Sequence, residues 1–299
     1  MHIAIAFDNN YLTPFYALIA SIFSNNLSKS IVFHCIINDN VSIDEKKKIQ
    51  TYILKHNSVV NFYSVDEEML SKFVLGGTWT SSVYYKMFFP LLIKQPLKKL
   101  LYLDTDMIVV GDLEPLFNID LESYALAAVY DNYVKTQPEI GIVEEGKYFN
   151  SGMLLYNIPL WNEQMLSQKA IEYLNEFPQN IKFVDQCALN AILKDNWYKV
   201  HEKYNLIYSY IPENISQKEL NEFIKDVVVV HFTLQRPWNL LCRNRLRKLY
   251  FRYLKESNYN NAKRIWDFEF IKLPRLIKLR IIEFYFDNRW IQYLWRKIK

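Results

Sequence analysis

The chain has 299 residues, 51% hydrophobic and 23% charged, which excludes intrinsic disorder and allows a large core. Its 6 Gly exclude the glycine-rich phosphate loops of P-loop and dinucleotide-binding proteins. The three cysteines are widely spaced, which excludes a disulfide framework and fits a reducing compartment. We see no secretory signal and no apolar run long enough to span a membrane, so we expect a cytoplasmic protein.

The net charge of +4 hides an uneven distribution. Residues 243–299 carry 16 Lys and Arg against 5 Asp and Glu, a net charge of about +11, whereas the preceding residues are acidic overall. The basic side chains alternate with bulky apolar ones, which argues against a nucleic-acid partner. The C-terminal region is therefore expected to differ in role from the rest of the chain.

The first half of the chain alternates strand-like and helix-like segments. The expected strands cover residues 3–7, 31–37, 59–63, 99–103 and 107–110, and the expected helices cover residues 14–23 and 44–56. This order favours an α/β fold with a mostly parallel sheet. Right-handed crossovers would place Asp8 and Asp104, which follow two of these strands, at the same sheet edge.

The second half continues with both kinds of element. Strands are expected over residues 125–129, 153–156 and 227–230, and helices over 160–177, 185–193, 243–253 and 275–286. Trp290, Tyr293 and Trp295 follow the last helix. The basic helices have two interpretations: surface helices packed on the main domain, or a basic, aromatic element that binds an anionic membrane surface.

The apolar strand at 99–103 ends in Asp104-Thr105-Asp106, the most informative motif of the chain. Ligands bind at the carboxyl ends of strands in such sheets, and two carboxylates suit Mg²⁺ or Mn²⁺ bound to a diphosphate. The alternative is that two acidic residues simply end a strand. His231 follows a run of valines and could complete an O,O,N ligand set, and Arg236 could bind the diphosphate.

Three further polar segments lie near expected element ends: Asp8-Asn9-Asn10, Phe149-Asn150-Ser151-Gly152 before a strand, and Asp185-Gln186 at a helix start. Taken in order with the acidic pair and His231-x₄-Arg236-Pro-Trp, they resemble glycosyltransferase family 8. This family of retaining enzymes includes bacterial lipopolysaccharide galactosyl- and glucosyltransferases and glycogenin. The resemblance covers residues 3–238.

The resemblance implies a GT-A fold, a Rossmann-like, mixed and mostly parallel sheet flanked by helices. Residues 1–240 would form the transferase domain and residues 241–299 a basic, aromatic helical appendage. Asp104, Asp106 and His231 would bind Mn²⁺ or Mg²⁺. The residues implied for the UDP-sugar are Ala6, Asp8, Asn10, Lys86, Asp104, Thr105, Asp131, Asn150, Ser151 and Arg236. The sequence departs from the family in having Arg236 in place of a Lys, one residue closer to the histidine, and Lys86 where several members have an Arg.

The implied reaction moves glucose or galactose from a UDP-sugar to a hydroxyl of a glycan, glycolipid or glycoprotein, with retention. We favour attack on the same face as the leaving phosphate, with Gln186 stabilising the anomeric centre and Asp185 holding sugar hydroxyls. The alternative is a covalent intermediate on Asp185. An anionic membrane at the inner face of the cell would be a second partner.

Two other functions remain open at this point. A nucleotide-sugar-binding, membrane-associated scaffold on a decayed transferase fold is one, although the intact Asp104, Asp106, His231 and Gln186 argue against decay. A phosphohydrolase with an Asp-x-Asp nucleophile is the other, but such enzymes usually carry that motif after their first strand, whereas here it lies past residue 100.

Overall fold

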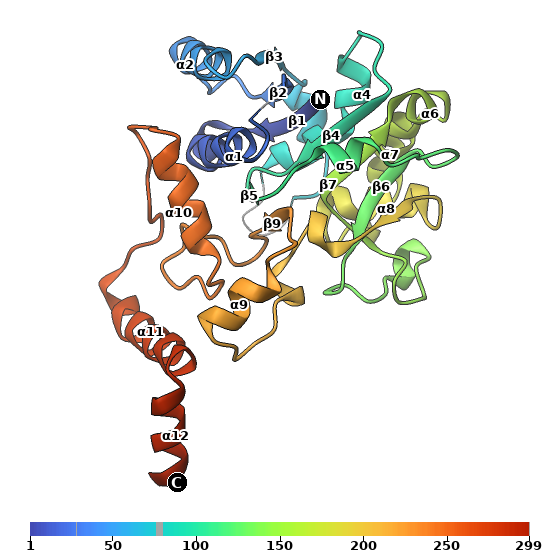
Figure 1. Cartoon of the computed structure of the whole chain (residues 1–299). Helices are drawn as coiled ribbons and strands as arrows, with labels where there is room; N and C mark the ends of the chain where they lie inside the picture. The colour runs from blue at the N-terminus through green and yellow to red at the C-terminus, as the bar shows by residue number, and fades with distance from the viewer. Residues whose placement is uncertain (28, 76–79, 299) are drawn as a thin grey trace.

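The computed structural model describes residues 1–27, 29–75 and 80–298. A seven-stranded sheet in the order β3-β2-β1-β4-β7-β6-β8 forms its centre, with helices packed around it (Figure 1). Its strands are β1 (His2–Phe7), β2 (Val32–Ile37), β3 (Val59–Tyr63), β4 (Lys99–Leu103), β6 (Leu126–Tyr130), β7 (Phe149–Asn157) and β8 (Tyr198–Val200). A second, two-stranded sheet pairs β5 (Met107–Val109) with β9 (Val229–His231).

The helices alternate with the strands in the first half of the chain, as expected. They are α1 (Leu12–Asn25), α2 (Ile43–Leu54), α3 (Glu67–Leu70), α4 (Phe89–Leu92), α5 (Glu114–Phe117), α6 (Ile158–Glu163), α7 (Leu166–Glu176), α8 (Val184–Leu193), α9 (Gln217–Phe223), α10 (Arg247–Glu256), α11 (Leu273–Asp287) and α12 (Arg289–Ile298). In the second half α6, α7 and α8 lie between β7 and β8, α9 precedes β9, and α10, α11 and α12 follow it.

The sheet is mixed and mostly parallel, as predicted. β3, β2, β1 and β4 run parallel to one another, β7 is antiparallel to both β4 and β6, and β8 is parallel to β6. Because β1 and β4 are parallel neighbours, their carboxyl ends lie at one edge of the sheet. Asp8 and Asp104 follow these ends, so the predicted common edge is confirmed.

Both faces of the sheet are buried at the central strands, which explains why β1 and β4 are apolar at nearly every position. Along β1, Ile3, Ile5 and Phe7 pack into a core that includes α1, whereas Ala4 and Ala6 belong to the core on the opposite face. Small alanines on that second face leave room for large aromatic side chains, which fill it. Packing on both faces fixes the positions of β1 and β4, and therefore of the residues that follow their carboxyl ends.

Two local predictions were wrong, and short elements such as β8 were not predicted. The helix expected over 160–177 is two helices, α6 and α7, separated at Met165, whose φ of 52° is left-handed. Trp161 and Leu166 from either side of this break are buried in one core, and the Trp161 indole donates a hydrogen bond to Ser167. β7 begins at Phe149, so the segment through Gly152 lies inside this strand and not before it. β8 was missed because three residues carry too little pattern.

The C-terminal region divides into a packed part and an exposed part. α10 lies along α1, with Tyr250, Tyr253 and Leu254 buried, so it follows the first of the two interpretations. α11 contacts α9 and contains no buried residue, and α12 extends away from the rest of the molecule (Figure 1). The Trp295 side chain lies outside the described residues. No helix within the described ranges has the length and apolar character needed to cross a membrane.

Candidate functional site

A cleft of about 500 Å³ opens at the carboxyl ends of β1 and β4. Most of the predicted site residues line it, although they come from segments far apart in the sequence. They are Ala6, Lys86, Asp104, Thr105, Asp106, Asp131, Asn150, Ser151, Asp185, Gln186, His231 and Arg236. The fold therefore gathers these side chains around one space large enough for a small ligand.

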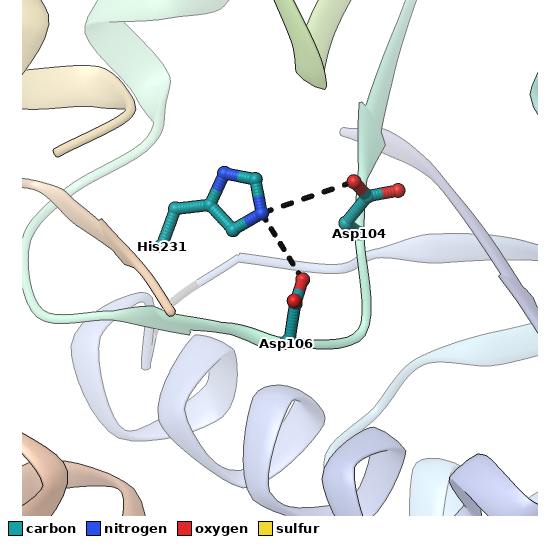
Figure 2. Close-up of side chains that lie close together, drawn as sticks. All are labelled: Asp104, Asp106 and His231. Carbon is teal, nitrogen blue, oxygen red and sulfur yellow. Dashed lines mark hydrogen bonds and ion pairs between the residues drawn. The ribbon is translucent and has the colours of Figure 1, made fainter. Parts of the chain in front are cut away.

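Asp104, Asp106 and His231 point toward one another at this cleft (Figure 2). The pairing of β5 with β9 sets Met107 opposite His231, which brings the imidazole beside the acidic pair. His231 Nε2 lies 3.1 Å from Asp106 Oδ1 and 3.9 Å from Asp104 Oδ2. One ligand atom from each residue lies within 4.8 Å of the other two.

This donor set fits a divalent cation. Two carboxylate oxygens and one imidazole nitrogen suit Mn²⁺ or Mg²⁺, and three ligands leave coordination positions for phosphate oxygens. Burial by itself raises the pKa of Asp106, but the charge and hydrogen bond of His231, together with Arg236, lower this pKa to about 2. Asp106 is therefore ionised at neutral pH, as a metal ligand must be.

Arg236 adds a positive charge next to the three metal-ligand candidates. Its Nε lies 3.8 Å from Asp106 Oδ2, and its guanidinium lies 5.8 Å from the ring centroid of Tyr11. The buried Nε finds no hydrogen-bond partner within the described part of the chain. A buried, unpartnered donor beside two metal-ligand candidates suits an anionic oxygen such as that of a phosphate.

Lys86 joins the acidic pair to the opposite wall of the cleft. Its buried ammonium lies 3.2 Å from Asp104 Oδ1 and 3.0 Å from Asp185 Oδ2, and it donates a hydrogen bond to the Ser151 carbonyl. Burial lowers the pKa of Lys86, but the two carboxylates outweigh this effect and raise it overall. A fixed positive charge therefore stands between the metal-ligand candidates and the predicted sugar-binding groups.

Asp185 and Gln186 begin α8, as predicted, and both are tightly held. Asp185 Oδ2 accepts a 2.7 Å hydrogen bond from the Ser151 hydroxyl; burial raises the pKa of this carboxyl, opposed by Lys86. Gln186 Oε1 accepts from the Ser151 backbone N–H at 3.0 Å, and its Nε2 donates to Asp131 at 3.1 Å. The amide of Gln186 is therefore fixed in orientation.

Asp8 and Asn10 do not line the cleft. Asp8 Oδ1 accepts the backbone N–H of Asn10 at 2.9 Å and so caps a short 3₁₀ turn, whereas Asp8 Oδ2 accepts a hydrogen bond from the Thr80 hydroxyl. The Asn10 side chain is exposed. The structure thus places this pair beside the cleft, where Asp8 contacts the cleft-lining residue Thr80.

Tyr102, Gly152 and Asn205 contact the metal-ligand candidates, and none of them was predicted as a site residue. The Tyr102 hydroxyl donates a 2.6 Å hydrogen bond to Asp104; since Tyr102 precedes it by two strand positions, the alternation of β4 could have indicated this contact. A Cβ on Gly152 would lie 2.3 Å from His231 Cε1, so only glycine fits there. Asn205 is fully buried against His231, and no sequence motif marks it.

Comparison with known proteins identifies the class. The family model described as Glycosyl transferase family 8 matches residues 2–242. General stress protein A of Bacillus subtilis (strain 168) is 32% identical over 272 residues, covering 87% of this chain and 95% of that protein. Lipopolysaccharide glucosyltransferase WaaO of Escherichia coli (strain K12) is 30% identical over 249 residues, covering 80% and 73%. The chain belongs to glycosyl transferase family 8, which confirms the predicted resemblance.

A solved structure supports the same fold. The crystal structure of the galactosyltransferase LgtC in complex with donor and acceptor sugar analogues matches with a TM-score of 0.75. Its sequence is 21% identical, and the match covers 92% of this chain and 100% of that one. The predicted GT-A fold is therefore confirmed.

Proposed function

We propose that the protein is a retaining glycosyltransferase that moves glucose or galactose from a UDP-sugar to an acceptor hydroxyl, and that it depends on Mn²⁺. The observation that carries the proposal is the cluster of Asp104, Asp106 and His231, with Arg236 beside it, whose buried Nε has no hydrogen-bond partner among the described residues. Two carboxylates and an imidazole do not bind a diphosphate by themselves. They do so through a cation, and a nucleotide sugar is the family's donor that carries a diphosphate.

The reaction breaks the bond between the anomeric carbon and the diphosphate, so negative charge develops on the leaving oxygen. A bound Mn²⁺ would supply Lewis-acid stabilisation of that charge. Arg236 would donate a charge-assisted hydrogen bond to the diphosphate from the side of Asp106. Lys86 would hold the side chains of Asp104 and Asp185 in position during the transfer through its contacts with both.

The arrangement of Asp185 and Gln186 favours attack on the same face as the leaving group. The Asp185 carboxylate is already bound by Lys86 and Ser151, which makes it a weak nucleophile. It is better suited to accept hydrogen bonds from the donor sugar. Gln186 is neutral and would stabilise the anomeric centre with its amide oxygen, while the departing phosphate takes the acceptor proton. Trapping a glycosyl adduct on Asp185 would overturn this mechanism.

We propose a glycan, glycolipid or glycoprotein as acceptor. WaaO is named a lipopolysaccharide glucosyltransferase, and LgtC has been crystallised with an acceptor sugar analogue, so acceptors that carry sugars are the natural class to test. The alternative of a binding scaffold predicts UDP binding without turnover. The intact pairing of Lys86 with Asp104 and Asp185 favours the enzyme, because a scaffold gains nothing from these buried charges.

We further propose a division of labour in which residues 1–240 carry the chemistry and residues 241–299 hold the enzyme on the inner face of the cell membrane. The exposed apolar side chains of the second part include Ile271, Ile277, Ile281, Phe284 and Trp290. Basic residues flank them, and each near an anionic leaflet contributes about 1 kcal/mol. Failure to sediment with anionic liposomes at low salt would contradict this role.

The test of the transferase is a panel of UDP-sugars incubated with Mn²⁺, in which release of UDP reports turnover. We expect UDP-glucose or UDP-galactose to be hydrolysed slowly without acceptor, and chelation of the metal to stop the reaction. UDP binding with no turnover of any donor would favour the scaffold. Release of free phosphate from a sugar phosphate would favour the phosphohydrolase.

A further inference from the structure

A second groove lies between α11 and the segment that leads from Tyr208 into α9, two helices that contact each other (Figure 1). Its volume of about 670 Å³ is within the usual range for a site that binds a small molecule. Apolar side chains form much of its lining, among them Ile211, Leu220, Leu279, Ile282 and Phe286. Charged side chains line the same groove, so it combines the two kinds of surface that an amphiphile requires.

α11 turns opposite faces to the groove and to solvent. The residues of α11 that line the groove recur at spacings of three and four, which places them on one side of the helix; they include Arg275, Lys278, Leu279, Ile282 and Phe286. Ile277, Ile281 and Phe284 are more than half exposed, and the helical repeat places them on the other side. The groove is therefore distinct from the exposed apolar face that we propose to contact a membrane.

Ion pairs and hydrogen bonds hold the walls of the groove together. Arg247 donates hydrogen bonds to both carboxylate oxygens of Glu283, at 2.9 and 2.8 Å, and so joins α10 to α11. At the other end of α11, the Asp287 carboxylate accepts hydrogen bonds from the backbone N–H of Gln217, at 2.8 Å, and from Arg245. The groove therefore lies between segments that are fixed relative to one another.

These contacts neutralise some of the lining charges and leave others unpaired. Glu283 and Arg245 line the groove and are both paired. Arg243, Arg275 and Lys278 also line it, are exposed, and form no ion pair with any described residue. Glu213 is the one lining carboxylate of the described chain that has no such pair. Three positive charges against one negative charge make the groove attractive to an anion.

The groove is connected to the cleft that holds the metal-ligand candidates. Tyr208 lines both spaces. Gln235, which lines the cleft, accepts through Oε1 a 2.8 Å hydrogen bond from the backbone N–H of Arg243, which lines the groove. Burial and Glu213 raise the pKa of Tyr208, and Arg243 opposes this rise, so the charge of Arg243 acts at the junction. A molecule that extends past Tyr208 would occupy both spaces.

We propose that this groove binds the lipid end of the acceptor, and that the acceptor is a glycolipid that carries phosphate. Arg243, Arg275 and Lys278 would bind the phosphate, the apolar lining would contact the lipid, and the sugar end would extend past Tyr208 into the cleft. The assignment rests on the proposed function and selects one of the acceptor classes given there. A phospholipid that only anchors the enzyme would not account for the connection to the cleft.

Calorimetric titration of the full-length protein with short alkyl compounds tests the groove. Octyl phosphate, used below the concentration at which it forms micelles, should bind. Inorganic phosphate and octyl glucoside should bind at least about 10-fold more weakly, because the first lacks the apolar group and the second lacks the charge. Inorganic phosphate or octyl glucoside with the affinity of octyl phosphate would overturn the proposal. Equal affinity for octanoate would overturn phosphate as the anion.

Two matched double variants locate the binding site. Arg275→Gln with Lys278→Gln should weaken octyl phosphate binding by about 5- to 10-fold, because it removes two of the three unpaired cations. Lys47→Gln with Lys55→Gln removes the same charge from exposed positions on α2 and at its C-terminal end, outside the groove lining, and should bind as the parent does. No loss in the first variant, or equal loss in both, would overturn the site.

A second variant keeps the site testable if the first one is unstable. Circular dichroism reports whether each variant folds, and we expect all of them to fold because the replaced side chains are exposed. Should Arg275→Gln with Lys278→Gln fail to fold, Arg243→Gln removes a cation from the opposite wall of the groove. We expect it to weaken octyl phosphate binding by about 2- to 5-fold. Parent-like binding by a folded Arg243→Gln would then overturn the site.

A transfer assay tests the acceptor class. The UDP-sugar that turns over is supplied with a labelled sugar, together with anionic and neutral fractions of a lipid extract from the cells that produce the protein. We expect the anionic fraction to be labelled, and labelled several-fold less by Arg275→Gln with Lys278→Gln than by the α2 control. Label in the neutral fraction alone, or in no lipid fraction, would overturn the acceptor class and leave the proposed transferase standing. Octyl phosphate binding without hydrolysis of any UDP-sugar would instead contradict the proposed function and support the groove.

Discussion

The cleft and the C-terminal helices are both rich in charged and aromatic side chains, but these charges are buried in the cleft and exposed to solvent on α11 and α12. In the cleft, Lys86, Asp106 and His231 are at most 8% exposed, and each is held by polar partners: Lys86 pairs with two carboxylates, and His231 contacts Asp106. In α11 no side chain is buried, and most of the described side chains of α12 are exposed. Buried, fixed charges suit chemistry on a small ligand, whereas exposed ones suit a large and adaptable surface.

The comparison shows that the effect of a charged side chain depends on how deeply it is buried. A charge held in a dry cleft acts strongly on a neighbouring group because little water screens it. A single charge on an exposed helix contributes little, and such charges have a sizeable effect only when many of them act together. We therefore expect single substitutions to have large effects in the cleft and small effects in α11 and α12.

The largest expected effect belongs to the metal-ligand candidates. Asp106→Asn should lower kcat for the donor by at least about 10²- to 10³-fold at saturating Mn²⁺, because it weakens the stabilisation of the leaving group. Donor hydrolysis followed by UDP release measures this. Asp39→Asn, which changes an exposed aspartate outside the cleft lining, is the matched control and should retain full activity. Parent-like turnover by Asp106→Asn would remove the basis for a metal site here.

Gly152→Ala should have the next largest effect. The added Cβ would lie 2.3 Å from His231 Cε1 and 2.8 Å from His231 Nδ1, so the imidazole must leave its present position beside the carboxylates. We expect about 10- to 100-fold weaker Mn²⁺ binding, measured by titration. Gly111→Ala crowds Val228 at 3.2 Å in the segments next to β5 and β9 and should leave Mn²⁺ affinity unchanged. Equal loss in both variants would indicate a general packing effect.

The pH dependence of stability should also differ between the two regions. The pKa of Asp106 is lowered to about 2, below its ordinary value near 4, so its stabilisation is complete above pH 4 and is lost as the pH falls toward 2. In the metal-free protein this is worth about 2–3 kcal/mol. The parent should therefore lose more unfolding free energy than Asp106→Asn between about pH 4.5 and about pH 2.5, which bracket the two pKa values.

Glu283 of α11 provides the comparison for this effect. Burial raises the pKa of Glu283, but its ion pairs with Arg247 and Arg280 lower it overall, so its stabilisation also fades as the pH falls. Because this carboxylate is closer to solvent than that of Asp106, we expect Glu283→Gln to change the pH dependence of the unfolding free energy less than Asp106→Asn does. Urea denaturation at the two pH values measures both variants. A larger change in Glu283→Gln would reverse the comparison.

The smallest expected effect is that of removing residues 289–299, which correspond to α12 and the residue after it. This helix extends away from the rest of the molecule (Figure 1), and none of its described residues lines the cleft, so hydrolysis of a UDP-sugar in solution should remain at the parent rate. Sedimentation with anionic liposomes should decrease, while neutral liposomes serve as the control. A large loss of hydrolysis would show that the two regions are not independent.

The sequence was most informative where the functional residues lie close together in the chain, next to a clear strand. Asp104 and Asp106 follow a clear apolar strand, and the valines before His231 mark its strand as well. The sequence did not predict the contacts between residues that only the tertiary fold brings together. Asn205 meets Asn150 across 55 residues, and neither the bulge of β7 nor the approach of Gly152 to His231 has a local pattern. The break at Met165 depends likewise on the tertiary contacts of Trp161.

The most direct test of the account is a crystal structure with Mn²⁺ and UDP, with diffraction recorded at the manganese absorption edge. The account predicts an anomalous peak between the carboxylates of Asp104 and Asp106 and Nε2 of His231, with the diphosphate on the same ion and near Arg236. A manganese peak elsewhere, or UDP bound in the cleft without one at this place, would contradict it.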